Sequence, residues 1–243
     1  MSGHSHFKTV KATKEADAVK RGKAFAKVGK VIAIAAKEGP DPITNSKLRV
    51  AIEQAKIVNM PKENIERAIK HGTGELAGES LEEVVFEGFG PGGIAVIVEG
   101  ITDNKNRTLG DIKQILGQHN GKLAGEGAVK WMFERKGCIV VDLKLQSEGW
   151  ENKEKLETMA IEAGADDIYW QEDNLDIYTK PEDLENVKKS LEAKEIKIEA
   201  SFLGWVPKDT VAIDERAKND CQKLFEALDE NDSVQEIYSN TKD

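Results

Sequence analysis

The hydrophobic pattern of this chain changes its period near residue 81. Before that point apolar residues recur at helical spacing, and the clearest stripe falls on Phe25, Val28, Ile32 and Ala35. After it, short runs of valine and isoleucine alternate with amphipathic helical segments. This change predicts an α+β protein of three domains, in which a helical domain precedes two α/β lobes.

The first 76 residues are expected to form the helical domain. The pattern predicts a long helix from Thr13 to Lys37, which ends before the Gly/Pro-rich residues 39–42. Ser46 is expected to cap a second helix, and Pro61 to stand at the first position of a third helix. That helix closes at Gly72, and the glycines that follow predict a linker.

The first lobe is expected to begin with a β-hairpin. Its predicted strands are Val84–Gly88 and Ile94–Ile101, joined through the glycine-rich residues 90–93. A helix is predicted over Lys105–His119 and a further strand over Val129–Glu134.

Residues 137–204 predict a second, ferredoxin-like lobe with the order β-α-β-β-α-β. The predicted elements are, in order, Cys138–Asp142, Glu151–Ala163, Ile168–Trp170, Leu175–Tyr178, Pro181–Glu192 and Ile196–Phe202.

The last 40 or so residues are too few to bury a core of their own. They predict a strand near Thr210–Ile213, a helix with Ala217 and Leu228 on its apolar face, and a strand at Val234–Tyr238. We expect this segment to return to the first sheet. The first lobe then comprises residues 80–136 and 205–243, and the ferredoxin-like lobe is inserted in it.

Charge is distributed unevenly along the chain. Residues 1–72 carry 15 Lys/Arg against 7 Asp/Glu, a net of +8, whereas the remainder carries 20 against 37, a net of −17. A basic segment on an otherwise acidic protein predicts contact with a polyanion that the basic segment leads. The acidic lobes are then expected to face protein partners or to orient the domain.

The predicted first helix has a cationic face. Lys20, Lys23, Lys27 and Lys30 repeat the spacing of the apolar stripe and lie about 150° away from it. We expect this face to contact nucleic-acid phosphates, which provide affinity with little sequence choice. The alternative is an ordinary solvated helix face. The candidate nucleic-acid-binding residues are Lys8, Lys11, Lys14, Lys20, Arg21, Lys23, Lys27 and Lys30.

The second and third helices could form a helix-turn-helix or a plain αα-hairpin. We favour the hairpin, because the third helix mixes Lys62 and Arg67 with Glu63 and Glu66 and shows no evident face for reading base edges.

Residues 102–108 form an unusual polar stretch between a strand and a helix. The first amides of that helix, with Asn104, Lys105 and Arg107, could hold an anion or contact a partner. The alternative is a capping loop in which Asp103 or Asn104 serves as the N-cap.

Patterns for catalysis, metals and cofactors are weak. Residues 88–93 match G-x-G-x-x-G, but a strand follows instead of the helix that a dinucleotide site requires. His4 and His6 are too few for a metal site, and neither Cys138 nor Cys221 belongs to a CxxC pair. We therefore predict no catalytic residue, metal, cofactor or small-molecule substrate. An enzyme working between the lobes, through Asp103, Asn104 or Arg107, is the weaker alternative.

No signal peptide or membrane span is predicted. The first twenty residues are polar and basic, and the longest apolar run, Val31–Ala36, has six residues. A bilayer requires about 20. We expect a cytoplasmic protein.

Three groups of motifs resemble the YebC/PmpR family of probable transcriptional regulatory proteins. The first is Gly3-His4-Ser5 with the basic run at residues 20–23, and the second spans residues 59–70. The third combines residues 87–93 and 102–108 with Trp131-Met132-Phe133-Glu134-Arg135-Lys136-Gly137.

The resemblance implies a cytoplasmic, three-domain protein that is not an enzyme. Bacterial members are described as DNA-binding transcriptional regulators, which makes DNA the expected partner. Mitochondrial relatives are translational activators, and bacterial members are also tied to stalled ribosomes. The alternative is therefore a ribosome-associated translation factor that binds ribosomal RNA. The sequence shows no evident base-reading helix, which slightly favours ribosomal RNA over DNA as the partner. Both hypotheses are kept.

Overall fold

The computed structural model describes residues 18–76, 78, 80–146, 152–171 and 173–242, with side chains from residue 21 onward. These residues form two compact units. One contains the described residues up to Val129 together with Asp214–Ile237, and the other contains Lys130–Ile213 and the residues from Tyr238. Each unit is described by itself.

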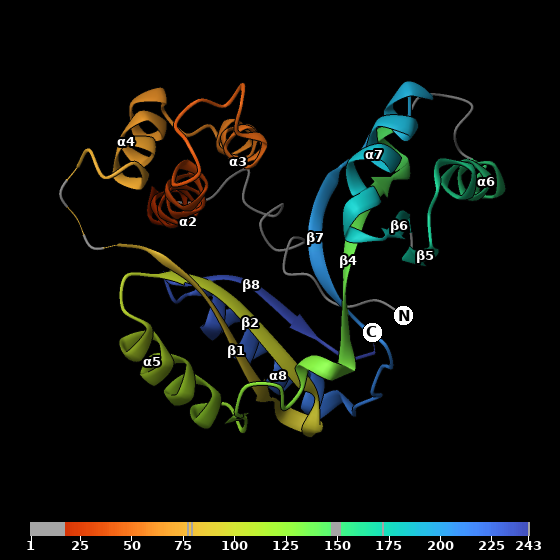
Figure 1. Cartoon of the computed structure of the whole chain (residues 1–243). Helices are drawn as coiled ribbons and strands as arrows, with labels where there is room; N and C mark the ends of the chain where they lie inside the picture. The colour runs from red at the N-terminus through yellow and green to blue at the C-terminus, as the bar shows by residue number, and fades with distance from the viewer. Residues whose placement is uncertain (1–17, 77, 79, 147–151, 172, 243) are drawn as a thin grey trace. The chain divides into compact units, whose positions relative to one another are not determined.

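Three helices form the helical part of the first unit: α2 (Ala18–Ala36), α3 (Ser46–Ile57) and α4 (Lys62–Gly72) (Figure 1). The N-cap of α3 is Asn45 and not Ser46, because the Asn45 side chain accepts a hydrogen bond from the Leu48 amide at 3.0 Å. Pro61 likewise stands one position earlier than predicted, as the N-cap residue of α4. The predicted start of the first helix at Thr13 lies outside the described residues.

Gly72 permits a close crossing between α2 and α4. A Cβ atom at this position would lie 2.1 Å from the backbone oxygen of Ala33. No side chain fits at such a distance, so the last residue of α4 must be glycine for the two backbones to approach.

The first sheet has the strand order β3-β1-β2-β8. Its strands are β1 (Glu82–Phe89), β2 (Ala95–Thr102), β3 (Lys122–Leu123) and β8 (Val234–Ser239), and its helices are α5 (Lys105–Gln118) and α8 (Glu215–Asp229). The position of β8 beside β2 confirms that the C-terminal segment returns to this sheet. The strand predicted at Thr210–Ile213 is wrong, because only an isolated bridge between Val211 and Thr241 forms there.

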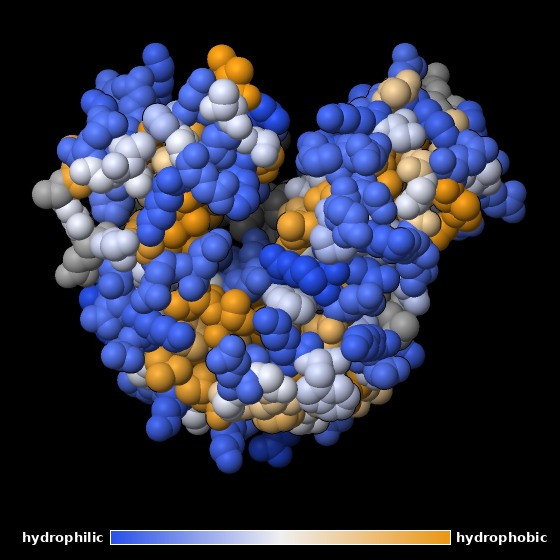
Figure 2. Space-filling view, viewed as in Figure 1, coloured by the Kyte–Doolittle hydropathy of each residue, from blue (hydrophilic) through white to orange (hydrophobic). Residues whose placement is uncertain are grey.

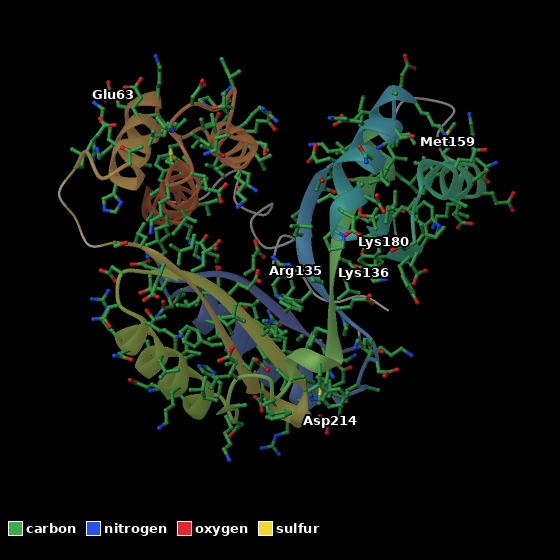
Figure 3. The ribbon with its side chains drawn as sticks, in the orientation of Figure 1. Glu63, Arg135, Lys136, Met159, Lys180 and Asp214 are labelled. Atoms are coloured by element: carbon green, nitrogen blue, oxygen red, sulfur yellow. The ribbon has the colours of Figure 1, made fainter. Side chains whose placement is uncertain are left out.

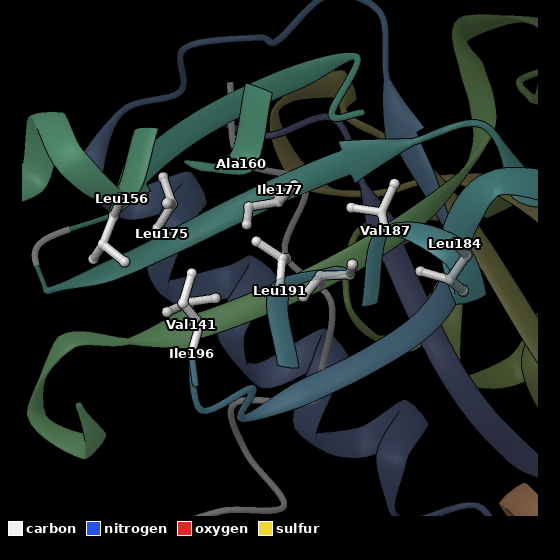
Figure 4. Close-up of a cluster of buried hydrophobic side chains, with 10 residues drawn as sticks. Val141, Leu156, Ala160, Leu175, Ile177, Leu184, Val187, Leu191 and Ile196 are labelled. Carbon is white, nitrogen blue, oxygen red and sulfur yellow. The ribbon is translucent and has the colours of Figure 1, made fainter. Parts of the chain in front are cut away.

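The second sheet has the order β5-β6-β4-β7. Its strands are β4 (Phe133–Asp142), β5 (Asp167–Gln171), β6 (Asn174–Thr179) and β7 (Ala200–Pro207), and its helices are α6 (Lys153–Ala163) and α7 (Leu184–Ala193). The paired strands are antiparallel. Chain order and sheet order together confirm the ferredoxin-like lobe. Figure 4 shows its core, in which residues of both helices meet Val141, Leu175 and Ile177.

One long strand, β4, replaces the two short strands predicted around Gly137. Gly137 lies inside this strand, and the position requires glycine because a Cβ atom would come within 2.3 Å of the Thr179 hydroxyl. The partner strand β7 is correspondingly later than predicted, and the pairing runs from Phe133–Pro207 to Val140–Ala200. Cross-strand pairing therefore overrides the local tendency of glycine to end a strand.

Candidate nucleic-acid interface

The apolar stripe of α2 faces the core of the helical domain. Ile32 and Ala35 are buried there, and Phe25 and Val28 pack against them from partly buried positions. The lysine row occupies the remaining part of the helix surface, as the 3.6-residue period requires.

The first part of the predicted cationic surface lies largely outside the described residues. Lys8, Lys11 and Lys14 precede them, and Lys20 belongs to α2 without a described side chain. Arg21 is exposed and Lys23 is half-buried. These two side chains are the described beginning of the α2 cationic face.

The second part of the lysine row contacts acidic residues of the same unit. Lys27 Nζ lies 2.5 Å from the Asp229 carboxylate at the end of α8, and its side chain is only 17% exposed. Lys30 Nζ donates to the Asp232 backbone oxygen at 2.8 Å. Burial lowers the pKa of Lys30 below its ordinary value, and the nearby charges of Asp232 and Asp103 act in the opposite direction. The lysine row, which looks like one surface in the sequence, is thus not continuous: Lys27 and Lys30 contact residues of the same unit.

Helices α3 and α4 carry cations that pair locally with acids. Lys47 contacts Glu38, and Lys62 Nζ lies 3.5 Å from Glu66 one turn along α4. On the face shown in Figure 2, the surface over these helices is mostly hydrophilic. The connection between them turns at Asn59, whose φ of 56° is left-handed, and buries Met60.

The polar stretch at residues 102–108 forms a capping loop at the start of α5. The Asn104 side chain accepts a hydrogen bond from the Arg107 amide at 3.0 Å, which makes Asn104 the N-cap of α5. The Thr102 and Thr108 hydroxyl oxygens lie 2.8 Å apart, and the Arg107 guanidinium contacts Asp103. Lys105 is exposed at the first position of the helix. The capping alternative is therefore confirmed for Asn104.

Other motifs resolve into structural roles. The glycine-rich residues 90–93 form a short 3₁₀ turn between β1 and β2, so a strand follows these glycines as predicted. Burial raises the pKa of the Cys138 thiol to about 12 and that of Cys221 to about 11, so both are protonated at neutral pH. His4 and His6 lie outside the described residues.

Within the described ranges, no group of three or more His, Cys, Asp or Glu side chains is placed to hold a metal ion. No helix among the described residues has the length and apolar character to cross a membrane.

Sequence reasoning missed two arrangements. Glu87 is a buried acid on β1 that accepts backbone hydrogen bonds from Gly127 and Val129. Trp205 lies beneath two cations, Lys130 and Arg135, at 5.0 and 5.1 Å from its ring centroid. An acid among the apolar residues of the predicted strand Val84–Gly88 was an available signal for the first. The second depends on strand register, for which the local sequence has no signal.

Comparison with known proteins covers nearly the whole chain. A family model described as the TACO1/YebC protein N-terminal domain matches residues 5–75, and one described as the TACO1/YebC second and third domain matches residues 81–241.

Relatives of similar length carry a regulatory name. A probable transcriptional regulatory protein of Thermoanaerobacter pseudethanolicus is 45% identical over 243 residues, covering 100% of this chain and 97% of the relative. One of Syntrophus aciditrophicus is 47% identical over 242 residues, covering 99% of this chain and 95% of the relative. The crystal structure of a conserved hypothetical protein from Aquifex aeolicus matches with a TM-score of 0.83 and 46% identity, covering 93% of this chain and 91% of that chain.

Proposed function

The chain belongs to the TACO1/YebC family, and we propose on this premise that it is a non-enzymatic regulator of gene expression that binds nucleic acid through its helical domain. The observation that carries the proposal is the net charge of +8 on residues 1–72 of a protein whose total is −9. The names of the relatives favour transcription, and hence DNA, as the process that this regulator serves. The proposal places it in the cytoplasm.

The start of α2 and the residues before it are the proposed phosphate contacts. Arg21 is exposed and Lys23 half-exposed there, whereas Lys27 contacts the Asp229 carboxylate and Lys30 donates to the Asp232 backbone oxygen. Lys8, Lys11, Lys14 and Lys20 extend the same basic segment in the sequence. Asn104, Lys105 and Arg107 stay a secondary candidate contact, in which exposed Lys105 is the cation next to the helix N-terminus.

The test is a charge reversal with a matched control. The variant Lys20→Glu/Arg21→Glu/Lys23→Glu should bind duplex DNA on the order of 100-fold more weakly at low salt, because three phosphate contacts are lost. Its log–log salt slope should fall in magnitude by about 2.7. Fluorescence anisotropy over a salt series measures both quantities in the full chain.

The control, Lys47→Glu/Arg49→Glu/Lys56→Glu, makes the same change in net charge on α3. It should retain most of the affinity if the start of α2 is the contact. An equal loss in both triple variants would show that total charge, and not this surface, governs binding.

A ribosomal RNA partner is the second candidate. Lys62 pairs locally with Glu66 on α4, which supports phosphate contact rather than base reading, a mode that serves RNA as well as DNA. Crosslinking in cells followed by sequencing of both DNA and RNA discriminates the two. Enrichment of promoter fragments supports the transcriptional role, and enrichment of ribosomal RNA supports the role in translation.

A further inference from the structure

Two cations converge on one indole ring where β4 begins and β7 ends. Lys130 Nζ lies 5.0 Å and Arg135 Cζ 5.1 Å from the Trp205 ring centroid. Arg135 and Trp205 are direct partners in the β4–β7 register, so their side chains share one face of the strand pair. Figure 3 labels Arg135 and Lys136 along β4. We refer to Lys130, Arg135 and Trp205 as the Trp205 cluster.

A second tryptophan, Trp131, is next to this cluster in the sequence and is 65% exposed. It belongs to the 3₁₀ turn Lys130–Met132, which leads directly into β4. The Lys208 amide donates a hydrogen bond to the Met132 backbone oxygen at 2.9 Å, which joins the residue after β7 to this turn. Both Lys130 and Lys208 are themselves exposed. Trp131 is therefore mostly exposed next to Lys130 in the chain, and the backbone of exposed Lys208 is joined to the same turn.

A purely structural role accounts for only part of this arrangement. Trp170 on β5 shows what such a role looks like: Lys153 lies 4.5 Å from its ring centroid, its indole donates to Glu157, and the ring packs against the core. Trp205 could stabilise its strands in the same way. That role does not explain the exposure of Trp131, because tryptophan normally buries most of its surface.

We propose that Trp131 and the Trp205 cluster form a binding surface for single-stranded nucleic acid. An unpaired base stacks on the exposed Trp131 ring, while Lys130, Arg135 and Lys208 contact the phosphates on either side. Flat aromatic rings among cations are the combination that single strands require, since every base offers a π-face and every nucleotide a negative charge. A duplex keeps its base faces stacked inside and does not meet this requirement.

This surface deepens the proposed function, on which it rests only in that the partner is nucleic acid. It lies in the unit that contains Lys130–Ile213, whereas the proposed α2 contact lies in the other unit. The two surfaces can therefore be tested separately.

The experiment measures binding of the full chain to three fluorescein-labelled probes: oligouridine RNA, oligothymidine DNA of the same length, and a duplex DNA. Trp131→Ala should weaken binding of the single-stranded probes about tenfold, because one base loses its stacking partner. It should leave duplex binding unchanged. Trp131→Phe should retain most of the affinity, because phenylalanine still offers a ring for stacking.

Lys130→Glu should also weaken binding of the single strands. Lys153→Glu is its matched control: it removes a lysine from the ring of Trp170 with the same change in charge, and should have no effect. A preference for RNA or for DNA identifies the physiological strand, and either preference supports the proposal.

Three results overturn the inference: no binding of the wild type to either single strand, single-strand binding by Trp131→Ala within twofold of wild type, or an equal loss on the duplex. The Lys20/Arg21/Lys23 variant separates the two proposals. If that variant keeps its duplex affinity while Trp131→Ala loses single strands, the proposed α2 contact fails and this inference stands. Loss in the α2 variant with no effect at Trp131 gives the reverse conclusion.

Discussion

Glu87 is a buried acid whose two carboxyl oxygens accept hydrogen bonds from backbone amides. Its Oε1 accepts from Gly127 at 2.6 Å and its Oε2 from Val129 at 2.7 Å, so the single side chain holds a loop 40 residues later in the chain. Hydrogen bonds to an ionised acceptor are stronger than neutral ones, and a buried amide without a partner is costly. We infer that Glu87 fixes the loop that precedes the second unit.

Replacement of Glu87 should therefore lower the stability of the fold. We expect Glu87→Ala to lower the free energy of unfolding by about 2 kcal/mol, because the buried Val129 amide and the Gly127 amide lose their acceptor. Glu87→Gln keeps one carbonyl acceptor and should cost less. Urea denaturation followed by circular dichroism measures both. An Ala variant as stable as wild type would contradict the role assigned to this carboxylate.

Helix contacts depend on where the backbone can approach. The crossing of α2 and α4 is possible because Gly72 lies over Ala33, whereas Gly110 in α5 has open space where a Cβ atom would stand. Gly72 is the last residue of α4 and Gly110 lies within α5, and the space around them differs.

Alanine substitutions at these two positions should have opposite effects. Gly72→Ala should lower the free energy of unfolding by about 3 kcal/mol, because the new methyl group overlaps the Ala33 carbonyl and separates the helices. Gly110→Ala should be neutral or stabilising by up to about 1 kcal/mol. Thermal unfolding of both variants measures the difference, and similar melting temperatures would argue against the close crossing.

At the scale of the whole molecule, the acidic C-terminal segment contacts part of the basic N-terminal segment. Lys27 contacts the carboxylate of Asp229 at the end of α8, and Lys30 donates to the Asp232 backbone oxygen, each across 202 residues of sequence. The uneven distribution of charge along the sequence therefore does not mean that every N-terminal lysine faces a partner. Lys27 and Lys30 instead contact the end of α8 and the residues after it, within the same unit.

Release of Lys27 should strengthen nucleic-acid binding. In Asp229→Asn the lysine loses its carboxylate partner, so we expect the magnitude of the salt slope on duplex DNA to rise by about 1. Glu230→Gln, which removes the same charge from the neighbouring exposed residue, is the control and should leave the slope unchanged. Fluorescence anisotropy over a salt series measures both variants. Equal slopes in the two would mean that Lys27 does not reach the phosphates.

Several features were predictable from the sequence because they depend on nearby residues. The apolar stripe of α2, a capping loop with Asp103 or Asn104 as the N-cap and the βαββαβ order follow from periodicity and capping chemistry within a few residues. The return of the C-terminal strand was also predictable, since a segment that small cannot bury its own core. The regional charge that motivates the proposed function can be counted directly in the sequence.

Tertiary structure alone decided which of these groups meet. The pairing of Lys27 with Asp229, the stacking of Arg135 on Trp205 and the continuity of β4 through Gly137 each depend on elements brought together from distant parts of the chain. Local sequence fixes the face on which a side chain lies, because helix and strand periods repeat every few residues. The group opposite that face is set by the packing of the whole domain, where burial and cross-strand register outweigh local preference.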